Sequence, residues 1–324
     1  MLYLKSISIG RSEAALDSVK KKLLTSLPYK TFRAERDVSD LLEHSGWKAT
    51  HGLYYEDTDT KKQRELDVVA RQIWQRSQHD VTQLCRITLI IEVKSMIGFH
   101  LLLSKHPATN QNFYEHIRWL GDGSGKYLEI AEMLRALDVE ESKISALVRK
   151  LHRYAYPRET ARMRPMMIRP NAAPVFTSFR ETNMGSEKEL EVSVFWRASQ
   201  GLRSAFKAIC QDIHETHLIN LRDAAEFEAN STSWPESMLW WTRERVSILD
   251  IVHPIVVTDA QLWLSDSSGP TECSFARFGA HTYTGSMSWW CDVVNASHLP
   301  RYIAELSKHY RSKLRRIKAK LGSY

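Results

Sequence analysis

An apolar segment near residue 90 reads Leu89-Ile90-Ile91-Glu92-Val93-Lys94, with a carboxylate and an ammonium at its end. Its length and aliphatic content predict a largely buried β-strand. Side chains alternate between the two faces of a strand, so we expect Glu92 and Lys94 on one face, with α-carbons about 7 Å apart. Unpaired charges in so apolar a strand are costly. Both residues therefore need partners from another part of the chain.

A second apolar segment, Glu65-Leu66-Asp67-Val68-Val69-Ala70, lies upstream and carries its own acidic residues. Asp67 and Glu92 on neighbouring strands could share a hard divalent cation, because Mg²⁺ favours oxygen ligands and is commonly held by one or two carboxylates. Lys94 would then face a metal-bound water, as in a hydrolytic site for phosphodiesters. The competing interpretation is an ordinary Glu–Lys ion pair on a solvated strand face.

The residues before these strands add a third acidic position. Residues 35–47 predict a short amphipathic helix with Val38, Leu41 and Leu42 on one face, ending at Gly46. Glu35 lies in its first turn. A strand is expected from Trp47 to Tyr55, followed by a hairpin tip over residues 56–62.

The predicted order is a helix with a glutamate, a strand, a strand with an aspartate, and a strand with Glu-x-Lys. This order resembles the PD-(D/E)XK, or restriction-endonuclease-like, nucleases, most closely Holliday junction resolvases and restriction-type members. The spacing agrees, since Glu35 precedes Gly46 by eleven positions. The resemblance covers residues 35–95, and Leu66 stands where the family name has proline.

The resemblance implies an α/β fold, in which a restriction-endonuclease-like mixed β-sheet core is flanked by helices. It also implies a metal-dependent nuclease in which Asp67, Glu92 and the backbone carbonyl of Val93 bind Mg²⁺ or Mn²⁺. Glu35 would bind that ion directly, through water, or by way of a second ion. Lys94 would orient or deprotonate the attacking water.

Two further polar residues are candidates for the site, and each also has a possible structural role. Gln200 lies on an expected helix, where some related nucleases use a glutamine to position water or phosphate. The competing and more common role is that of a polar residue on the helix surface. Glu65 is two residues from Asp67 and could contribute to metal binding or form a salt bridge at the entry of the strand.

The 324 residues are expected to form one interrupted core with a helical insertion. We expect an N-terminal helical segment over residues 1–30 and the first part of the core, with the catalytic strands, over 31–105. A helical insertion and connector would occupy 106–190. The second part, 191–324, would hold a helix over 192–217, strands over 248–264 and 288–294, and a basic C-terminal helix from Leu299. The strand over 248–264 is expected to break at His253-Pro254.

The net charge of +7 favours a polyanionic partner. Eight Lys or Arg residues lie between Arg301 and Lys320, where they could follow phosphates or form a solvated helix end. The resemblance implies a nucleic acid, DNA before RNA, and allows a homodimer or a protein partner in a defence or repair system. The alternative functions are an inactive nuclease fold that binds nucleic acid or acts as a scaffold, and a nuclease acting on RNA.

The four cysteines are Cys85, Cys210, Cys273 and Cys291, and they form no Cys-x-x-Cys pair. This scatter disfavours a disulfide framework or a structural zinc site. The sequence shows no charged leader with an apolar stretch and no uninterrupted apolar run near twenty residues. A reducing cytoplasmic location without membrane contact is therefore expected.

Overall fold

The computed structural model describes the following parts of the chain: residues 13–57, 59–78, 81–96, 98–105, 116–119, 174–183, 193–230, 245–281 and 287–321, with 132, 135, 140–142 and 145. Most of the expected insertion, 106–190, therefore lies outside the described residues, as do most of its expected helices. Two strands within that range are described, β5 (His116–Trp119) and β6 (Val175–Asn183), where helix and connector were expected.

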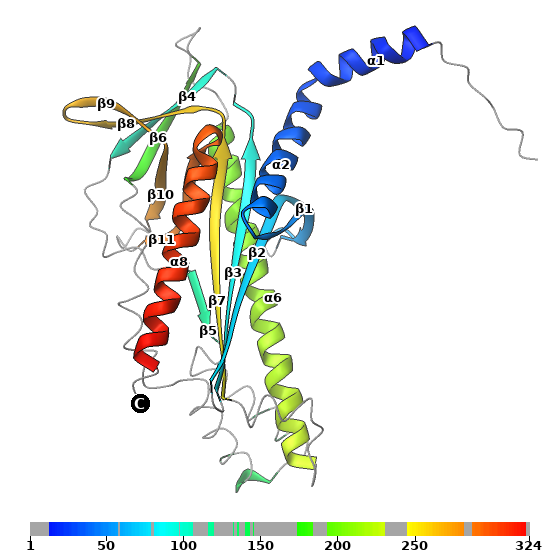
Figure 1. Cartoon of the computed structure of the whole chain (residues 1–324), viewed down its shortest axis with the longest axis vertical. Coiled ribbons are helices and arrows are strands. Elements are labelled where there is room, and N and C mark those ends of the chain that lie inside the picture. Colours follow the sequence, from blue (N-terminus) through cyan, green and yellow to red (C-terminus); the bar gives the residue numbers. More distant parts are fainter. Residues whose placement is uncertain are drawn as a thin grey trace, which may run out of the picture.

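The molecule is built around one large mixed sheet flanked by helices (Figure 1). In the described part of the chain eleven strands join it, in the order β1-β2-β3-β7-β11-β10-β6-β4-β8-β9, and β5 pairs with β7 beside this path. The mixed α/β class expected from the sequence is confirmed at this level.

The candidate site belongs to the first part of this sheet. Helix α2 (Leu27–His44) precedes an antiparallel meander of β1 (Lys48–Glu56), β2 (Gln63–Gln78) and β3 (Val81–Lys94). Further along the chain, the long helix α6 (Val194–Asn230) precedes β7 (Arg245–Thr258), which pairs with β3 in parallel. The helix expected to start near residue 35 begins earlier, at Leu27, because Ser26 caps it and Pro28 occupies its first turn.

The remaining elements extend the sheet and cover it. They are α1 (Glu13–Thr25), β4 (Phe99–Lys105), β8 (Gln261–Asp266), β9 (Gly269–Cys273), β10 (Phe275–His281), β11 (Met287–Asn295), the short 3-10 helix η3 (Ala296–His298) and α8 (Leu299–Leu321). The expected helices at both ends of the chain and the strand over 288–294 are thus present. Helix α1 extends away from the sheet (Figure 1).

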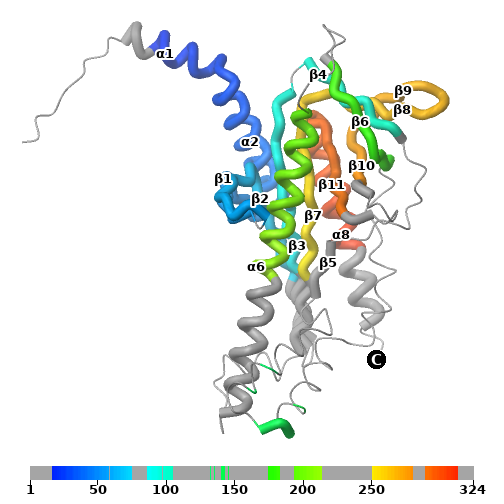
Figure 2. The backbone as a smooth tube through the Cα atoms, turned by 180° about the vertical axis from the view of Figure 1, so that it is seen from behind, coloured from blue at the N-terminus to red at the C-terminus, as the bar shows by residue number. Residues whose placement is uncertain are grey.

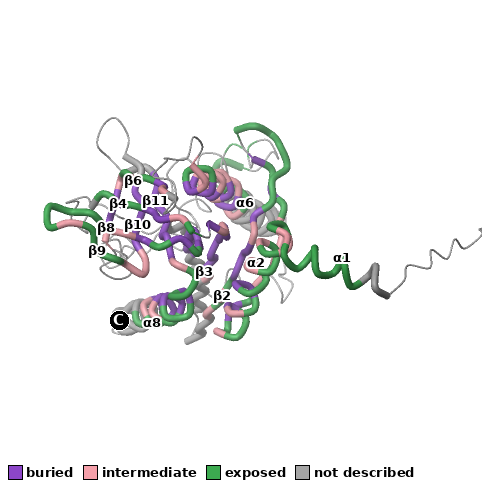
Figure 3. The backbone as a smooth tube through the Cα atoms, turned by 90° about the horizontal axis from the view of Figure 1, so that it is seen from above, coloured by how far each residue is buried: buried purple, intermediate pink, exposed green. Residues whose placement is uncertain are grey.

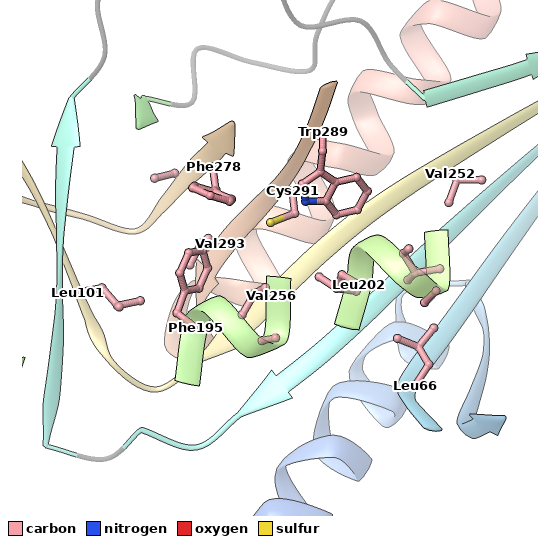
Figure 4. Packing of buried hydrophobic residues seen from close by; sticks show 14 of the residues in the cluster. Leu66, Leu101, Phe195, Leu202, Val252, Val256, Phe278, Trp289, Cys291 and Val293 are labelled. Carbon is pink, nitrogen blue, oxygen red and sulfur yellow. The ribbon is translucent and has the colours of Figure 1, made fainter. Parts of the chain in front are cut away.

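Two apolar cores cover the two faces of the sheet. Helix α6 packs on one face, where Phe195 and Leu202 belong to the same buried apolar cluster as the strand residues Val256 and Val293 (Figure 4). Helices α2 and α8 pack on the other face, through residues such as Leu42 and Ile303. Figure 3 shows α6 and α8 on opposite sides of β3, and Figure 2 shows α6 running along β3 and β7.

The start of α6 is fixed by a carboxylate from the sheet. Glu181 of β6 is buried and accepts hydrogen bonds from the backbone N–H groups of Val194 (3.0 Å) and Phe195 (2.8 Å), and from the Ser193 hydroxyl. A negative charge is favourable at the N-terminus of a helix, where backbone N–H groups have no partner within the helix. Glu181 therefore anchors the helix that reaches the candidate site.

Strand β7 does not break at His253-Pro254, contrary to the expectation from its proline. Proline has no N–H to donate, so it is rare in the middle of a sheet. Along one edge, β5 pairs with residues 249–252 of β7 and β11 pairs with residues 255–258. Pro254 lies in the interval between these two ladders, and on the other edge it is paired with Ile90 of β3. On the edge shared by β5 and β11, the missing N–H therefore costs no ladder bond.

A buried charge network fastens α8 to the sheet. Arg277 of β10 donates to both oxygens of Asp292 on β11, at 2.6 and 2.8 Å. Tyr302 of α8 donates to Asp292 Oδ2 at 2.6 Å, and His253 of β7 lies 2.9 Å from the same oxygen and 2.8 Å from the Tyr310 hydroxyl. Burial opposes the ionisation of Asp292, but Arg277 outweighs it and, with His253, holds the Asp292 pKa well below its usual value.

We expect Asp292→Asn to lower the free energy of unfolding at pH 7 by about 3–5 kcal/mol, because it leaves the buried Arg277 charge without its counter-ion. Because the Asp292 pKa is lower in the folded state, ionised Asp292 stabilises the fold at pH values above about 4, the ordinary pKa of an aspartate. This stabilisation is lost as the pH falls from about 4 toward the lower pKa of Asp292 in the folded state. The difference between wild type and variant should therefore narrow below about pH 4.

Urea unfolding at pH 7, 5 and 3 measures both effects. Asp40→Asn, at an exposed position of α2, is the control and should change little. Equal stability of Asp292→Asn and wild type at pH 7 would show that the network does not hold α8 in place.

Candidate active site

Strand pairing brings Asp67 and Glu92 together. The antiparallel ladder between β2 and β3 pairs Val68 with Ile91, so the next positions are Asp67 and Glu92. Asp67 Oδ2 also accepts a hydrogen bond from the backbone N–H of Val93, at 2.7 Å. Two of the residues predicted to form the site thus lie side by side near the end of β3.

The Lys94 ammonium joins the two carboxylates. Its Nζ atom lies 2.9 Å from Asp67 Oδ2 and 2.6 Å from Glu92 Oε2. The Glu92 side chain is 8% exposed, whereas that of Lys94 is 27% exposed. The simple Glu–Lys pair on a solvated face is therefore not what the structure has, because a second carboxylate participates and Glu92 is buried.

Glu35 reaches the site from α2. It lies close enough for its charge to interact with those of Asp67 and Lys94. Its Oε2 atom is 2.9 Å from Nε2 of His51 on β1, and the Glu35 side chain is 15% exposed. The structure therefore brings Asp67, Glu92 and Lys94 into direct contact, and Glu35 lies near enough for its charge to interact with theirs.

Helix α6 packs on the face of the sheet opposite α2 and approaches Glu92 from that side. A β-carbon built on Gly201 would lie 3.5 Å from Glu92 Oε1, so the helix backbone passes close to this carboxylate. The Tyr55 hydroxyl donates to the Gly201 carbonyl at 3.1 Å and holds β1 against the helix. Gln200, the fifth expected residue, is half-buried beside Gly201, and its proposed contact with water or phosphate stays a prediction.

The electrostatics of the site follow from the burial of several like charges. Burial raises the pKa of Glu92 to about 7; Asp67 and Glu35 add to the shift, and Lys94 opposes it. Burial also raises the pKa of Glu35, against the hydrogen bond with His51. For Lys94 burial acts in the other direction, but the charges of Glu92 and Asp67 outweigh it and raise the Lys94 pKa. The lysine is thus held as a cation, whereas burial disfavours the ionised forms of Glu92 and Glu35.

Other polar residues near the end of β3 have structural roles. The Ser95 hydroxyl donates to Asp259 Oδ2 at 2.9 Å, and the backbone N–H of Met96 donates to Oδ1 of the same residue. These bonds tie the turn after β3 to the end of β7. Glu65 is exposed and accepts a hydrogen bond from the Tyr54 hydroxyl at 3.3 Å.

Sequence reasoning did not find His51, Tyr55 or Gly201. All three come from elements expected as a strand or a helix, but their pattern contains no motif. His51 carried one usable signal, since it is a titratable residue in the strand directly after the helix of Glu35. The approach of Gly201 depends on packing across the sheet and has no local signature.

The donor set suits a hard cation, because carboxylate oxygens are the ligands that Mg²⁺ and Mn²⁺ prefer. The Asp67 and Glu92 carboxylates already converge on one positive group, the Lys94 ammonium. Over the residues that are described, no cluster of three or more His, Cys, Asp or Glu side chains has the spacing of a complete metal site. That Asp67 and Glu92 hold a cation, with Glu35 and the Val93 carbonyl as further oxygen donors, stays a prediction from the sequence.

The chain matches no family model, no curated protein and no solved structure. Across the described helices, none combines the length and the apolar character needed to cross a membrane.

Glu92→Gln tests whether the site carries uncompensated negative charge. A carboxylate with a raised pKa favours folding below its ordinary pKa, near 4.5, and loses that contribution as the pH rises through about 7. In metal-free buffer at pH 8 we expect the variant to equal or exceed wild type in stability, by up to about 3 kcal/mol. Urea unfolding at pH 5 and pH 8 measures the change, and a large loss of stability at pH 8 would identify a plain salt bridge.

Proposed function

We propose that the chain is a metal-dependent nuclease that hydrolyses phosphodiester bonds, in DNA before RNA, with a PD-(D/E)XK-type site. The observation that carries the proposal is the convergence of Asp67 and Glu92 on the Lys94 ammonium, with Glu35 added from α2. Buried titratable groups with perturbed pKa values gather at functional sites more often than elsewhere. The Mg²⁺ or Mn²⁺ ion is part of the proposal.

The order of elements supports this assignment. Helix α2 is followed directly by the antiparallel meander of β1, β2 and β3. Helix α6 and β7, which is parallel to β3, come later in the chain, after β4, β5 and β6. The resemblance implies a three-stranded catalytic unit followed by a helix and further strands of a mixed sheet. The proposed fold is therefore restriction-endonuclease-like, and the remaining strands would extend this core.

Each residue of the site has a distinct task in the proposed reaction. Asp67 and Glu92 supply negative oxygen ligands, and the hydrogen bond from the Val93 N–H keeps Asp67 in place. A bound divalent cation would lower the pKa of a water molecule and stabilise charge on the phosphate. Because its own pKa is raised, Lys94 is suited to orient the water and to stabilise developing negative charge as a cation. The raised pKa disfavours Lys94 as the base that deprotonates the water, and a bound cation would favour that role by lowering the pKa.

Nucleic-acid binding is proposed for the outer surface of the same molecule. Arg301, Lys308 and Arg311 of α8 are exposed, although Arg301 also pairs with Glu305 at 3.0 Å. The other basic residues of this helix lie beyond the side chains that the structure describes. Contacts from such residues to phosphate would make binding dependent on salt concentration.

We expect Lys94→Ala to abolish cleavage while the protein still folds and binds DNA, because the lysine contributes charge and orientation at the reacting phosphate. The assay compares supercoiled plasmid, linear duplex and single-stranded DNA, with RNA as a further substrate, in Mg²⁺, Mn²⁺ and EDTA. Lys207→Ala is the matched control, since Lys207 also forms an ion pair, at 2.6 Å with Asp59, outside the proposed site.

Cleavage in Mg²⁺ or Mn²⁺ that is lost in EDTA and in Lys94→Ala, but kept in Lys207→Ala, supports the proposal. Wild-type rates in Lys94→Ala would contradict the role of the lysine. Salt-sensitive binding without cleavage in any metal would favour an inactive binding or scaffold protein.

Asp67→Ala should lose both cleavage and divalent-ion affinity, because it removes a carboxylate that would bind the ion. Calorimetric titration with Mn²⁺ measures the affinity of both proteins at one pH. Asp37→Ala, at an exposed position of α2, provides the control. Unchanged Mn²⁺ affinity in Asp67→Ala would place the cation elsewhere or remove it from the proposal.

A further inference from the structure

We propose that His51 is a positioning residue that holds the Glu35 carboxylate toward the cation site. The inference rests on the proposed function, which it extends by one residue that carries no sequence motif. His51 Nε2 lies 2.9 Å from Glu35 Oε2, and the contact joins β1 to α2. The two residues are sixteen positions apart, so the pair is a tertiary contact.

Two contacts fix the position of His51, one through its backbone and one through its ring. In the ladder between β1 and β2 it is paired with Val68, the residue after Asp67, which sets its backbone beside the site. Its ring is packed edge-to-face against Phe32 of α2, with ring centroids 5.2 Å apart. Phe32 and Glu35 are three residues apart and so lie on one side of α2. His51 therefore contacts a ring and a carboxylate of the same helix surface.

Glu35 needs such a partner because the other charges of the site act on it in opposite senses. Asp67 repels its carboxylate, whereas Lys94 attracts it. A glutamate has three rotatable bonds and can turn away from a repelling neighbour toward solvent. The contact with His51 engages Oε2 and restricts that rotation, so the carboxylate stays within the field of Asp67 and Lys94.

The expected consequence concerns cation affinity. Removal of a group that orients a metal ligand typically lowers metal affinity or activity by about 10–100-fold. Loss of His51 should therefore weaken cation binding without removing a ligand. A glutamine at this position offers an N–H donor on a side chain of similar length and should recover most of the affinity.

The experiment measures Mn²⁺ binding by the loss of the free-ion signal in electron paramagnetic resonance, with no nucleic acid present. The proteins are wild type, His51→Ala, His51→Gln, Glu35→Ala and the double variant of Glu35→Ala with His51→Ala. His44→Ala is the matched control, because His44 is an exposed histidine of α2 bonded to a backbone carbonyl. Circular dichroism melting curves establish that each variant is folded.

We expect His51→Ala to weaken Mn²⁺ binding by about 10–100-fold, with His51→Gln close to wild type and His44→Ala unchanged. In the Glu35→Ala background, removal of His51 should have no further effect, because the histidine acts through that carboxylate.

Two results would overturn the inference while leaving the proposed function intact. The first is wild-type affinity in His51→Ala. The second is an equal loss on removing His51 with and without Glu35, which would make the histidine act independently. If wild type itself binds no Mn²⁺, the proposed function fails, and the role of His51 fails with it.

Discussion

The antiparallel register between β2 and β3 is the constraint on which the candidate site depends. It places Asp67 beside Glu92, and the Lys94 ammonium then lies within 2.9 Å of both carboxylates. Side chains in a strand alternate faces, so a slip of one residue would send Asp67 to the other side of the sheet. Because each strand carries a buried apolar face, such a slip would also expose core residues. The packing of the two apolar cores thus fixes the strand register that brings Asp67, Glu92 and Lys94 together.

Two clusters of buried charge in this fold differ in how fully their charges are compensated. Around Asp292 the charges are compensated, and Arg277 and His253 hold the Asp292 pKa well below its usual value. Around Glu92 two carboxylates, those of Glu92 and Asp67, share the Lys94 ammonium, and burial raises the Glu92 pKa to about 7. The first cluster fastens α8 to the sheet. The second is costly for folding, and this cost is typical of a site kept for function.

Several elements could be predicted because their signals are local. The end of α2 was set by Gly46, whose φ of 82° is the left-handed conformation that glycine adopts readily. The apolar runs of β3 and β11 and the periodicity of α6 were also recognisable. Other elements were missed: β5 and β6 lie where helix and connector were expected. Strand β7 continues through Pro254, which lies in the gap between the ladders that β5 and β11 form along one edge of the strand.

By itself the sequence determined which residues carry charge in otherwise apolar strands, namely Asp67, Glu92 and Lys94, and that Glu35 precedes them on a helix. Alternation and periodicity are properties of the local backbone, so they can be read without a fold. The tertiary structure decided which of these charges meet, that Gly201 approaches Glu92, and that His51 holds Glu35. These contacts join segments far apart in the chain, and they depend on how α2 and α6 pack on opposite faces of one sheet.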